Sequence, residues 1–227
     1  MSDIGLLNEK PLHSSLKKWY LRPGDLVEVR VDKYIIDIVR DDVLIEIQTC
    51  SFPSIKSKVI DLVKSHKLRL VYPIAMEKWI IKLDQKTGGE SQRRRSPRKG
   101  RITDIFGEMV SFPQLMTDSN FSIEVLLIRE EEIRRFDEKR NWRRKGWGIE
   151  ERRLLEVLDR KLFERPEDWQ DLIPEDIGES FTAKELAKTT GIEKPLAQKM
   201  AYCLRKAGVI NLIDKKGHAH LYMIGGN

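Results

Sequence analysis

The chain has 227 residues, of which 40% are hydrophobic and 34% charged, and its formal net charge is +6. This length suffices for one large core or two small ones, so we expect two domains or one domain with an appendage. Two isolated cysteines exclude a disulfide framework, and the lack of about 18 consecutive apolar residues excludes a membrane-spanning helix. The charge favours nucleic acid over an anionic membrane as partner, and the reducing cytoplasm is the expected location.

The first part of the chain predicts a helix, three strands, a helix and two more strands. The first helix covers residues 9–20, with Leu12, Leu16 and Trp19 on one face. Runs of β-branched residues between polar turns indicate the strands. The expected strands lie at 25–31, 34–40, 43–49, 67–75 and 78–84, and the second helix at 51–66.

The middle of the chain is strongly basic. Residues 85–101 combine Gly, Ser and Pro with a dense run of Arg and Lys, which predicts a mobile loop because almost nothing in it is apolar. Residues 122–130 predict one more strand, which either extends the same sheet or leads out of it. A second basic cluster at 139–147 interleaves arginines with Trp142 and Trp147, and such rings stack on bases or on guanidinium groups.

The last part of the chain has a helical period. Residues 149–163 carry four leucines on one stripe, Leu154 and Leu158 among them, which predicts that a second domain begins with a helix near residue 148. Two more helices follow, the first with Thr182 and Glu185 as a capping box and Gly191 as its C-terminal stop. A β-hairpin with its turn at 214–217 comes last. This order is that of a winged helix-turn-helix, a DNA-binding module that also mediates protein contacts or dimerises, so a homodimer is a second expectation.

The hairpin formed by residues 34–49 contains the candidate chemistry. If Asp41 and Asp42 form its turn, Asp37 lies directly opposite Glu46, with Gln48 on the same face. Opposed carboxylates destabilise a sheet unless a cation or a shared proton offsets them, and two carboxylates with room for water and phosphate suit Mg²⁺ or Mn²⁺. The opposite, buried face is expected to hold Ile36, Ile38, Ile45 and Ile47.

This arrangement of elements and acidic residues resembles the PD-(D/E)XK nuclease superfamily over residues 8–84. The resemblance implies an α/β, restriction-endonuclease-like αβββαβ core with a mixed sheet, and Mg²⁺-dependent hydrolysis of DNA phosphodiester bonds. It implies that Asp37 and Glu46 bind the metal and that Gln48 occupies the third motif position, where lysine is usual. Some restriction endonucleases of the superfamily also have glutamine there.

The same resemblance suggests two further catalytic residues. A glutamate on the first helix of many members corresponds to Glu9. The missing lysine has two replacements at the start of the second helix, of which Lys56 is preferred over Lys58 because it leaves Val59 free for the core. These assignments divide the chain into a nuclease-like core at 1–84, a basic connecting segment at 85–147 and a winged helix-turn-helix domain at 148–227.

Plainer interpretations exist for each feature. Asp37 and Glu46 also fit the solvated face of an antiparallel sheet, and Glu9 also fits the favourable first turn of a helix. The rival to a nuclease is a catalytically inactive DNA-binding or regulatory protein, and a third reading is RNA processing. The predicted contacts with double-stranded DNA are Arg93, Arg94, Arg95, Arg98, Lys99, Arg143, Arg144, Lys194, Gln198, Lys199, Lys215 and Lys216.

Overall fold

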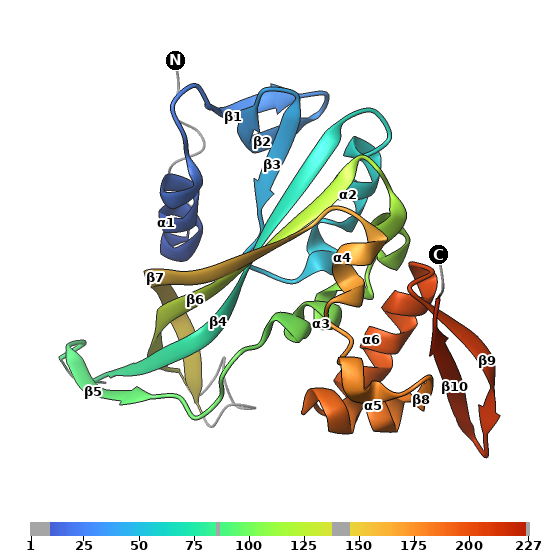
Figure 1. The fold of residues 1–227 in the computed structure, drawn as a ribbon. Helices are drawn as coiled ribbons and strands as arrows, with labels where there is room; N and C mark the ends of the chain where they lie inside the picture. The colour runs from blue at the N-terminus through green and yellow to red at the C-terminus, as the bar shows by residue number, and fades with distance from the viewer. Residues whose placement is uncertain (1–9, 85–86, 138–145, 226–227) are drawn as a thin grey trace.

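The computed structural model describes residues 10–84, 87–137 and 146–225 (Figure 1). A mixed sheet of seven strands, in the order β1-β2-β3-β4-β6-β7 with β5 beside β4, dominates the chain. Its strands are β1 (Leu26–Val31), β2 (Tyr34–Arg40), β3 (Val43–Ile47), β4 (Lys67–Leu83), β5 (Glu90–Arg95), β6 (Phe121–Phe136) and β7 (Trp147–Phe163). The helices that accompany it are α1 (Pro11–Tyr20), α2 (Lys56–Leu62) and α3 (Phe106–Met109).

The predicted order of the first elements, from α1 to β4, is present, and the α/β class with a mixed sheet is confirmed. β3 and β4 run parallel, as do β4 and β6, whereas β1, β2 and β3 are antiparallel neighbours. The two strands predicted at 67–75 and 78–84 are one long strand, β4. Pro73 is tolerated within it because β3 ends at Ile47, opposite Val71, so no β3 partner lies beside Pro73.

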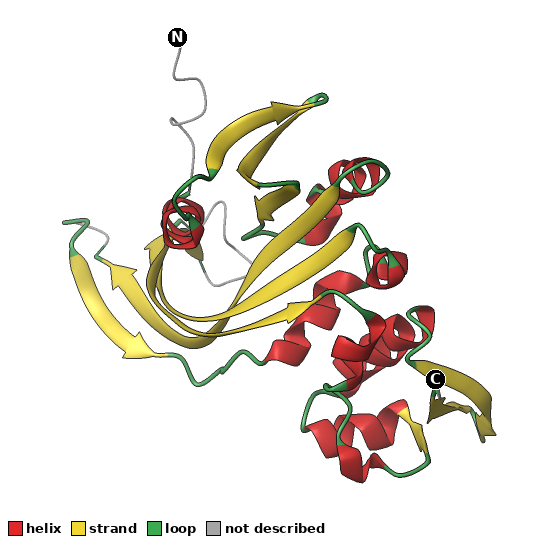
Figure 2. Ribbon diagram, turned by 45° about the horizontal axis from the view of Figure 1, so that its top comes forward, coloured by secondary structure: helices red, strands yellow, loops and turns green. Residues whose placement is uncertain are grey.

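Two layers of side chains cover the sheet. One cluster joins α1 to the sheet through Leu12, Leu16 and Tyr20. Tyr20 replaces Trp19 in the predicted apolar face of this helix, because a spacing of four residues from Leu16 points it inward, and Trp19 is 45% exposed. The other cluster lies on the α2 side, and Figure 2 shows how strongly the long strands curve between the layers.

The prediction of a helix for residues 149–163 is wrong, because this segment belongs to strand β7. It pairs antiparallel with β6 from Ile123↔Phe163 to Phe136↔Trp147. Its charged residues meet opposite charges on that neighbour: Arg152 pairs with Glu130, and Glu156 with Arg129. A second unit therefore does not begin at residue 148, since the large sheet continues to Phe163.

The predicted mobile loop at 85–101 also contains regular structure. Residues Glu90–Arg95 form β5, which pairs antiparallel with the end of β4. Arg93 lies over the ring of Trp79, 4.1 Å from its centroid, and pairs with Glu131, while Arg95 pairs with Glu77. Neighbouring acids thus offset charge that would otherwise oppose strand formation.

The C-terminal part is helical with a small sheet. It contains α4 (Pro166–Gln170), β8 (Ser180–Thr182), α5 (Ala183–Thr190), α6 (Lys194–Lys206), β9 (Ile210–Lys216) and β10 (Ala219–Ile224). The predicted capping box of Thr182 and Glu185 is confirmed, as is the left-handed Gly191 after α5. The hairpin turn lies at residues 217–218, slightly later than predicted.

One continuous core joins the C-terminal part to the sheet. The same buried cluster contains Leu62 of α2, Phe163 of β7 and Leu204 of α6. Arg101 adds polar links by donating to the carbonyl oxygens of Thr190 and Gly191 at the end of α5. In the described residues, no helix is long and apolar enough to cross a membrane.

Candidate functional site

The β2–β3 hairpin forms with the predicted turn at Asp41 and Asp42. Its register runs from Arg40↔Val43 to Ile38↔Ile45. One position further, the side chain of Asp37 enters the ladder, where its Oδ2 accepts a hydrogen bond of 2.8 Å from the main-chain N–H of Ile47. Asp37 thus lies at the point where the two strands cease to pair regularly.

The four isoleucines of the hairpin are all buried, as predicted, but they do not share one face. Ile36 belongs to the cluster on the α2 side, whereas Ile38, Ile45 and Ile47 belong to the cluster beneath α1. Asp37 also turns toward α1, so two successive residues of β2 face the same layer. This break in the alternation directs the Asp37 carboxylate toward α1, whereas Glu46 pairs with Lys58 of α2. The prediction that the two carboxylates share one face of a regular hairpin is therefore wrong, because they contact helices of opposite layers.

Asp37 has a helical neighbour. Its Oδ2 lies 3.2 Å from Nε2 of His13 on α1. Burial acts to raise the pKa of Asp37, but the hydrogen bond and charge of His13 and the N–H of Ile47 outweigh it, so the pKa is lowered. Asp37 is therefore an ionised carboxylate at neutral pH.

The pKa of Glu46 is shifted in the opposite direction. Its residue is 9% exposed, and Oε1 lies 2.5 Å from Nζ of Lys58 on α2. Burial and the nearby charge of Asp37 raise the pKa of Glu46 to about 7, although Lys58 acts to lower it. Lys58 thus compensates the negative charge of Glu46 only in part.

The lysine beside the carboxylates is Lys58, and the preference for Lys56 was wrong. Lys58 contacts Glu46 and also donates to the carbonyl oxygen of Ile35 at 2.7 Å. Lys56, two positions earlier and about 200° away around the helix, is exposed. Leaving Val59 for the core did not require the choice of Lys56, because Lys58 and Val59 are adjacent in the helix and point in different directions.

Gln48 lies directly after β3 and is bonded to the following loop. Its side-chain amide donates to the carbonyl oxygen of Ser51 at 3.0 Å and to Oγ of Ser54 at 3.1 Å. Its main-chain N–H donates to the carbonyl oxygen of Val71. Gln48 therefore positions the turn that leads into α2 and Lys58. Glu9 lies outside the described residues.

The donor set suits a divalent ion only in part. Across residues 10–84, 87–137 and 146–225, no three His, Cys, Asp or Glu side chains form a metal-binding group. Asp37 and Glu46 supply two carboxylates, each of which has a protein partner, His13 and Lys58 respectively. Mg²⁺ commonly takes one or two carboxylates and completes its shell with water and phosphate oxygens, so these residues would suit only a metal bound jointly by protein and substrate.

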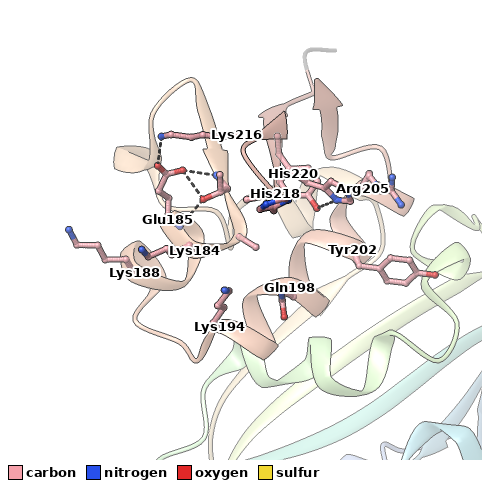
Figure 3. Close-up of a pocket in the computed structure, with 14 residues that line it drawn as sticks. Lys184, Glu185, Lys188, Lys194, Gln198, Tyr202, Arg205, Lys216, His218 and His220 are labelled. Carbon is pink, nitrogen blue, oxygen red and sulfur yellow. Dashed lines mark hydrogen bonds and ion pairs between the residues drawn. The ribbon is translucent and has the colours of Figure 1, made fainter. Parts of the chain in front are cut away.

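A second feature is a cavity of about 900 Å³ in the C-terminal part, which we call the basic concavity. Its walls are α5, α6 and the β9–β10 hairpin (Figure 3). It brings together three predicted DNA-contacting residues, Lys194, Gln198 and Lys216. The two helices also contribute Lys184, Lys188, Tyr202 and Arg205 to the lining, and the hairpin contributes His218 and His220.

The other predicted nucleic-acid contacts lie elsewhere. Lys199 approaches the carbonyl oxygen of Gly107 on α3, and Lys215 is exposed on β9 without lining the concavity. Arg93 and Arg95 form ion pairs on β5. Exposed positions further hold Arg94, Arg98 and Lys99. Arg143 and Arg144 lie outside the described residues, as does Trp142.

Comparison with known proteins gives a family and one relative. The model of a family described as "Domain of unknown function (DUF8091)" matches residues 10–164, which is the segment from α1 to the end of β7. A protein of Treponema pallidum (strain Nichols), described as "Uncharacterized protein", is 28% identical over 221 residues, covering 96% of this chain and 86% of that protein. No solved structure matches.

Proposed function

The chain belongs to the DUF8091 family, and from the geometry of its own carboxylate site we propose that it is a divalent-metal-dependent nuclease acting on DNA. The observation that carries the proposal is the pair of carboxylates where the β2–β3 hairpin opens, since the charge of Asp37 acts on the pKa of Glu46 and Glu46 pairs with Lys58. The order of elements from α1 to β4 supports a PD-(D/E)XK, restriction-endonuclease-like core.

Each residue has a defined part in this proposal. Asp37 and Glu46 would hold Mg²⁺ or Mn²⁺. Asp37 is ionised and is oriented by Ile47 and His13, and Lys58 compensates the charge of Glu46 only in part. The ion would supply Lewis-acid stabilisation of the phosphate and a more acidic bound water. Lys58 would neutralise charge that develops on the scissile phosphate once the ion replaces it beside Glu46. Gln48 would fix the turn between Glu46 and Lys58.

The C-terminal part contributes binding in this proposal. The order α4, β8, α5, α6, β9 and β10 supports a winged helix-turn-helix that holds DNA. A homodimer and a cytoplasmic location are parts of the same proposal.

A second function is favoured by one observation. Both carboxylates already have protein partners, Lys58 for Glu46 and His13 for Asp37. Such a closed site suits a protein that retains the nuclease fold and binds DNA without cutting it. The two functions differ in one measurable property, which is cleavage.

The deciding experiment incubates the protein with supercoiled plasmid, linear duplex and single-stranded DNA in Mg²⁺, Mn²⁺ or EDTA. The nuclease proposal expects metal-dependent cleavage that falls at least about 100-fold in Asp37→Asn, Glu46→Gln and Lys58→Met. Lys56→Met is the matched control and retains cleavage. Binding with no cutting in any metal supports the second function, and cleavage that survives Asp37→Asn and Glu46→Gln contradicts the assignment of the site.

A further inference from the structure

The basic concavity concentrates positive charge that the protein itself does not neutralise. Lys184, Lys188, Lys194 and Arg205 have no acidic partner within 4.0 Å among the described residues. The acid in its lining, Glu185, pairs with Lys216. Arginines on the large sheet are paired more often, as Arg93, Arg95, Arg129, Arg134, Arg135, Arg152 and Arg153 illustrate. An anion in the concavity would therefore meet four cations that have no acidic partner.

The concavity is a trough between α6 and the β9–β10 hairpin, and α5 forms its third wall. On α6, Lys194, Gln198, Tyr202 and Arg205 recur at intervals of three or four residues and form one exposed stripe, opposite the fully buried Cys203. The opposite wall is the β9–β10 hairpin with His218 and His220. Glu185 anchors this wall, because it accepts hydrogen bonds from Lys216 and from Thr182 (Figure 3).

A trough with a helix on one side and a hairpin on the other matches the backbone ridge of a nucleic-acid duplex. Such a ridge separates two grooves, so a ridge seated between the walls brings α6 into one groove and the hairpin into the next. The major groove of B-DNA admits a helix, whereas that of A-form RNA is too deep and narrow. The walls therefore favour duplex DNA.

Within the α6 stripe, Gln198 differs from its neighbours. It is uncharged and exposed, and its amide offers a donor and an acceptor, the pair that matches the N6 and N7 edge of adenine. We infer that the basic concavity is a duplex-DNA site in which Gln198 contacts a base edge, while Lys184, Lys188, Lys194 and Arg205 contact phosphates. This deepens the proposed function and rests on it for the kind of substrate.

The DNA segment held in the concavity differs from the segment at the carboxylates. Lys199 of α6 approaches Gly107 of α3, and α6 contacts α3 on that side. The helix therefore lies between the concavity and the large sheet, as the close-up in Figure 3 also shows. Binding in the concavity should consequently not need Asp37 or Glu46.

The test measures fluorescence anisotropy of a labelled mixed-sequence DNA duplex in EDTA, where no hydrolysis occurs. Lys194→Ala and Arg205→Ala should together weaken binding by about five- to 150-fold. Each lost phosphate contact should reduce the slope of log K against log salt by about 0.9. Lys199→Ala, on the same helix but facing α3, is the matched control and should change affinity less than about twofold.

A selection from random duplexes tests Gln198. Gln198→Ala should broaden the selected sequence at one adenine position while leaving the salt slope unchanged. Equal losses for Lys194→Ala and Lys199→Ala, or tighter binding to single-stranded DNA or duplex RNA, would overturn the duplex-DNA site. An unchanged selected sequence would overturn the role of Gln198. Because binding is measured in EDTA and cleavage with a metal ion, failure of cleavage and failure of this site are separable.

Discussion

Nζ of Lys58 on α2 lies 2.5 Å from Oε1 of Glu46 on β3, although the two residues are twelve positions apart. The helix thus supplies the positive charge beside Glu46, whereas position 48, directly after β3, holds the uncharged Gln48. Because burial and Asp37 still hold the pKa of Glu46 at about 7, this ion pair compensates the site incompletely.

Glu46 should make stability depend on pH. Its folded-state pKa of about 7 lies above the ordinary value of 4.5, so the folded protein binds more protons than the unfolded chain between these values. This contribution is fully present below pH 4.5 and is lost as the pH rises through 7, with a magnitude up to about 3 kcal/mol. Urea unfolding at several pH values checks it, and a Glu46→Gln variant with the same pH dependence would refute it.

Divalent ions should stabilise the folded protein. At pH 8, an ion that binds Asp37 and Glu46 should raise the free energy of unfolding, by about 1.4 kcal/mol at ten times its dissociation constant. Thermal unfolding with and without Mn²⁺ measures this. Glu46→Gln is the comparison, and an equal rise in that variant would place the ion elsewhere.

Lys58 should matter for stability and Lys56 should not. Lys58→Met leaves Glu46 buried without its partner, so we expect a loss of about 1–3 kcal/mol at pH 8. The loss should shrink at pH 5, where Glu46 takes up a proton. Lys56→Met should change stability by less than about 0.5 kcal/mol at both pH values. Chemical denaturation of both variants decides the point.

Arg152 should stabilise the pairing of β7 with β6. Glu130 is fully buried, and Arg152 approaches its Oε2 at 2.6 Å while also donating to the carbonyl oxygen of Thr49. Arg152→Met should cost about 2–3 kcal/mol, less than a fully broken buried pair, because Lys78 still contacts Glu130. Arg153→Met is the neighbouring control, with an expected change below about 0.5 kcal/mol. Similar losses in both would contradict this role.

Trp169 should hold the C-terminal part to the sheet. It is 1% exposed and stacks on Phe163 of β7 at a centroid distance of 4.1 Å. Trp169→Ala should cost about 3–5 kcal/mol, whereas Trp19→Ala, at an exposed position, should cost less than about 1 kcal/mol. Because the core is continuous, near-ultraviolet and far-ultraviolet circular dichroism should report one shared unfolding transition. Two separate transitions would contradict a continuous core.

The candidate site was predictable from local patterns up to the point where the hairpin opens. The turn at Asp41 and Asp42 and the strands on either side follow from alternation alone. The isoleucines are buried as predicted, but Ile36 lies on the opposite side of the sheet from the other three. The choice of Lys58 over Lys56 does not, because it depends on the rotation of α2 against β3. Likewise, the bond from Ile47 to Asp37 breaks an alternation that the sequence argument assumed to be regular.

The sequence by itself determined the early order of helix and strands, the acidic hairpin, the capping box of Thr182 and the basic character of α6, because each depends on residues a few positions apart. Tertiary structure alone decided that residues 147–163 form β7, that β5 arises within a basic segment, and which cations meet in the concavity. The leucine spacing of residues 149–163 favours a helix, but these residues form a long antiparallel ladder with β6. Their hydrogen-bond and ion-pair partners on β6 are distant in the sequence. Local propensity amounts to tenths of a kcal/mol per residue, and such a ladder outweighs it.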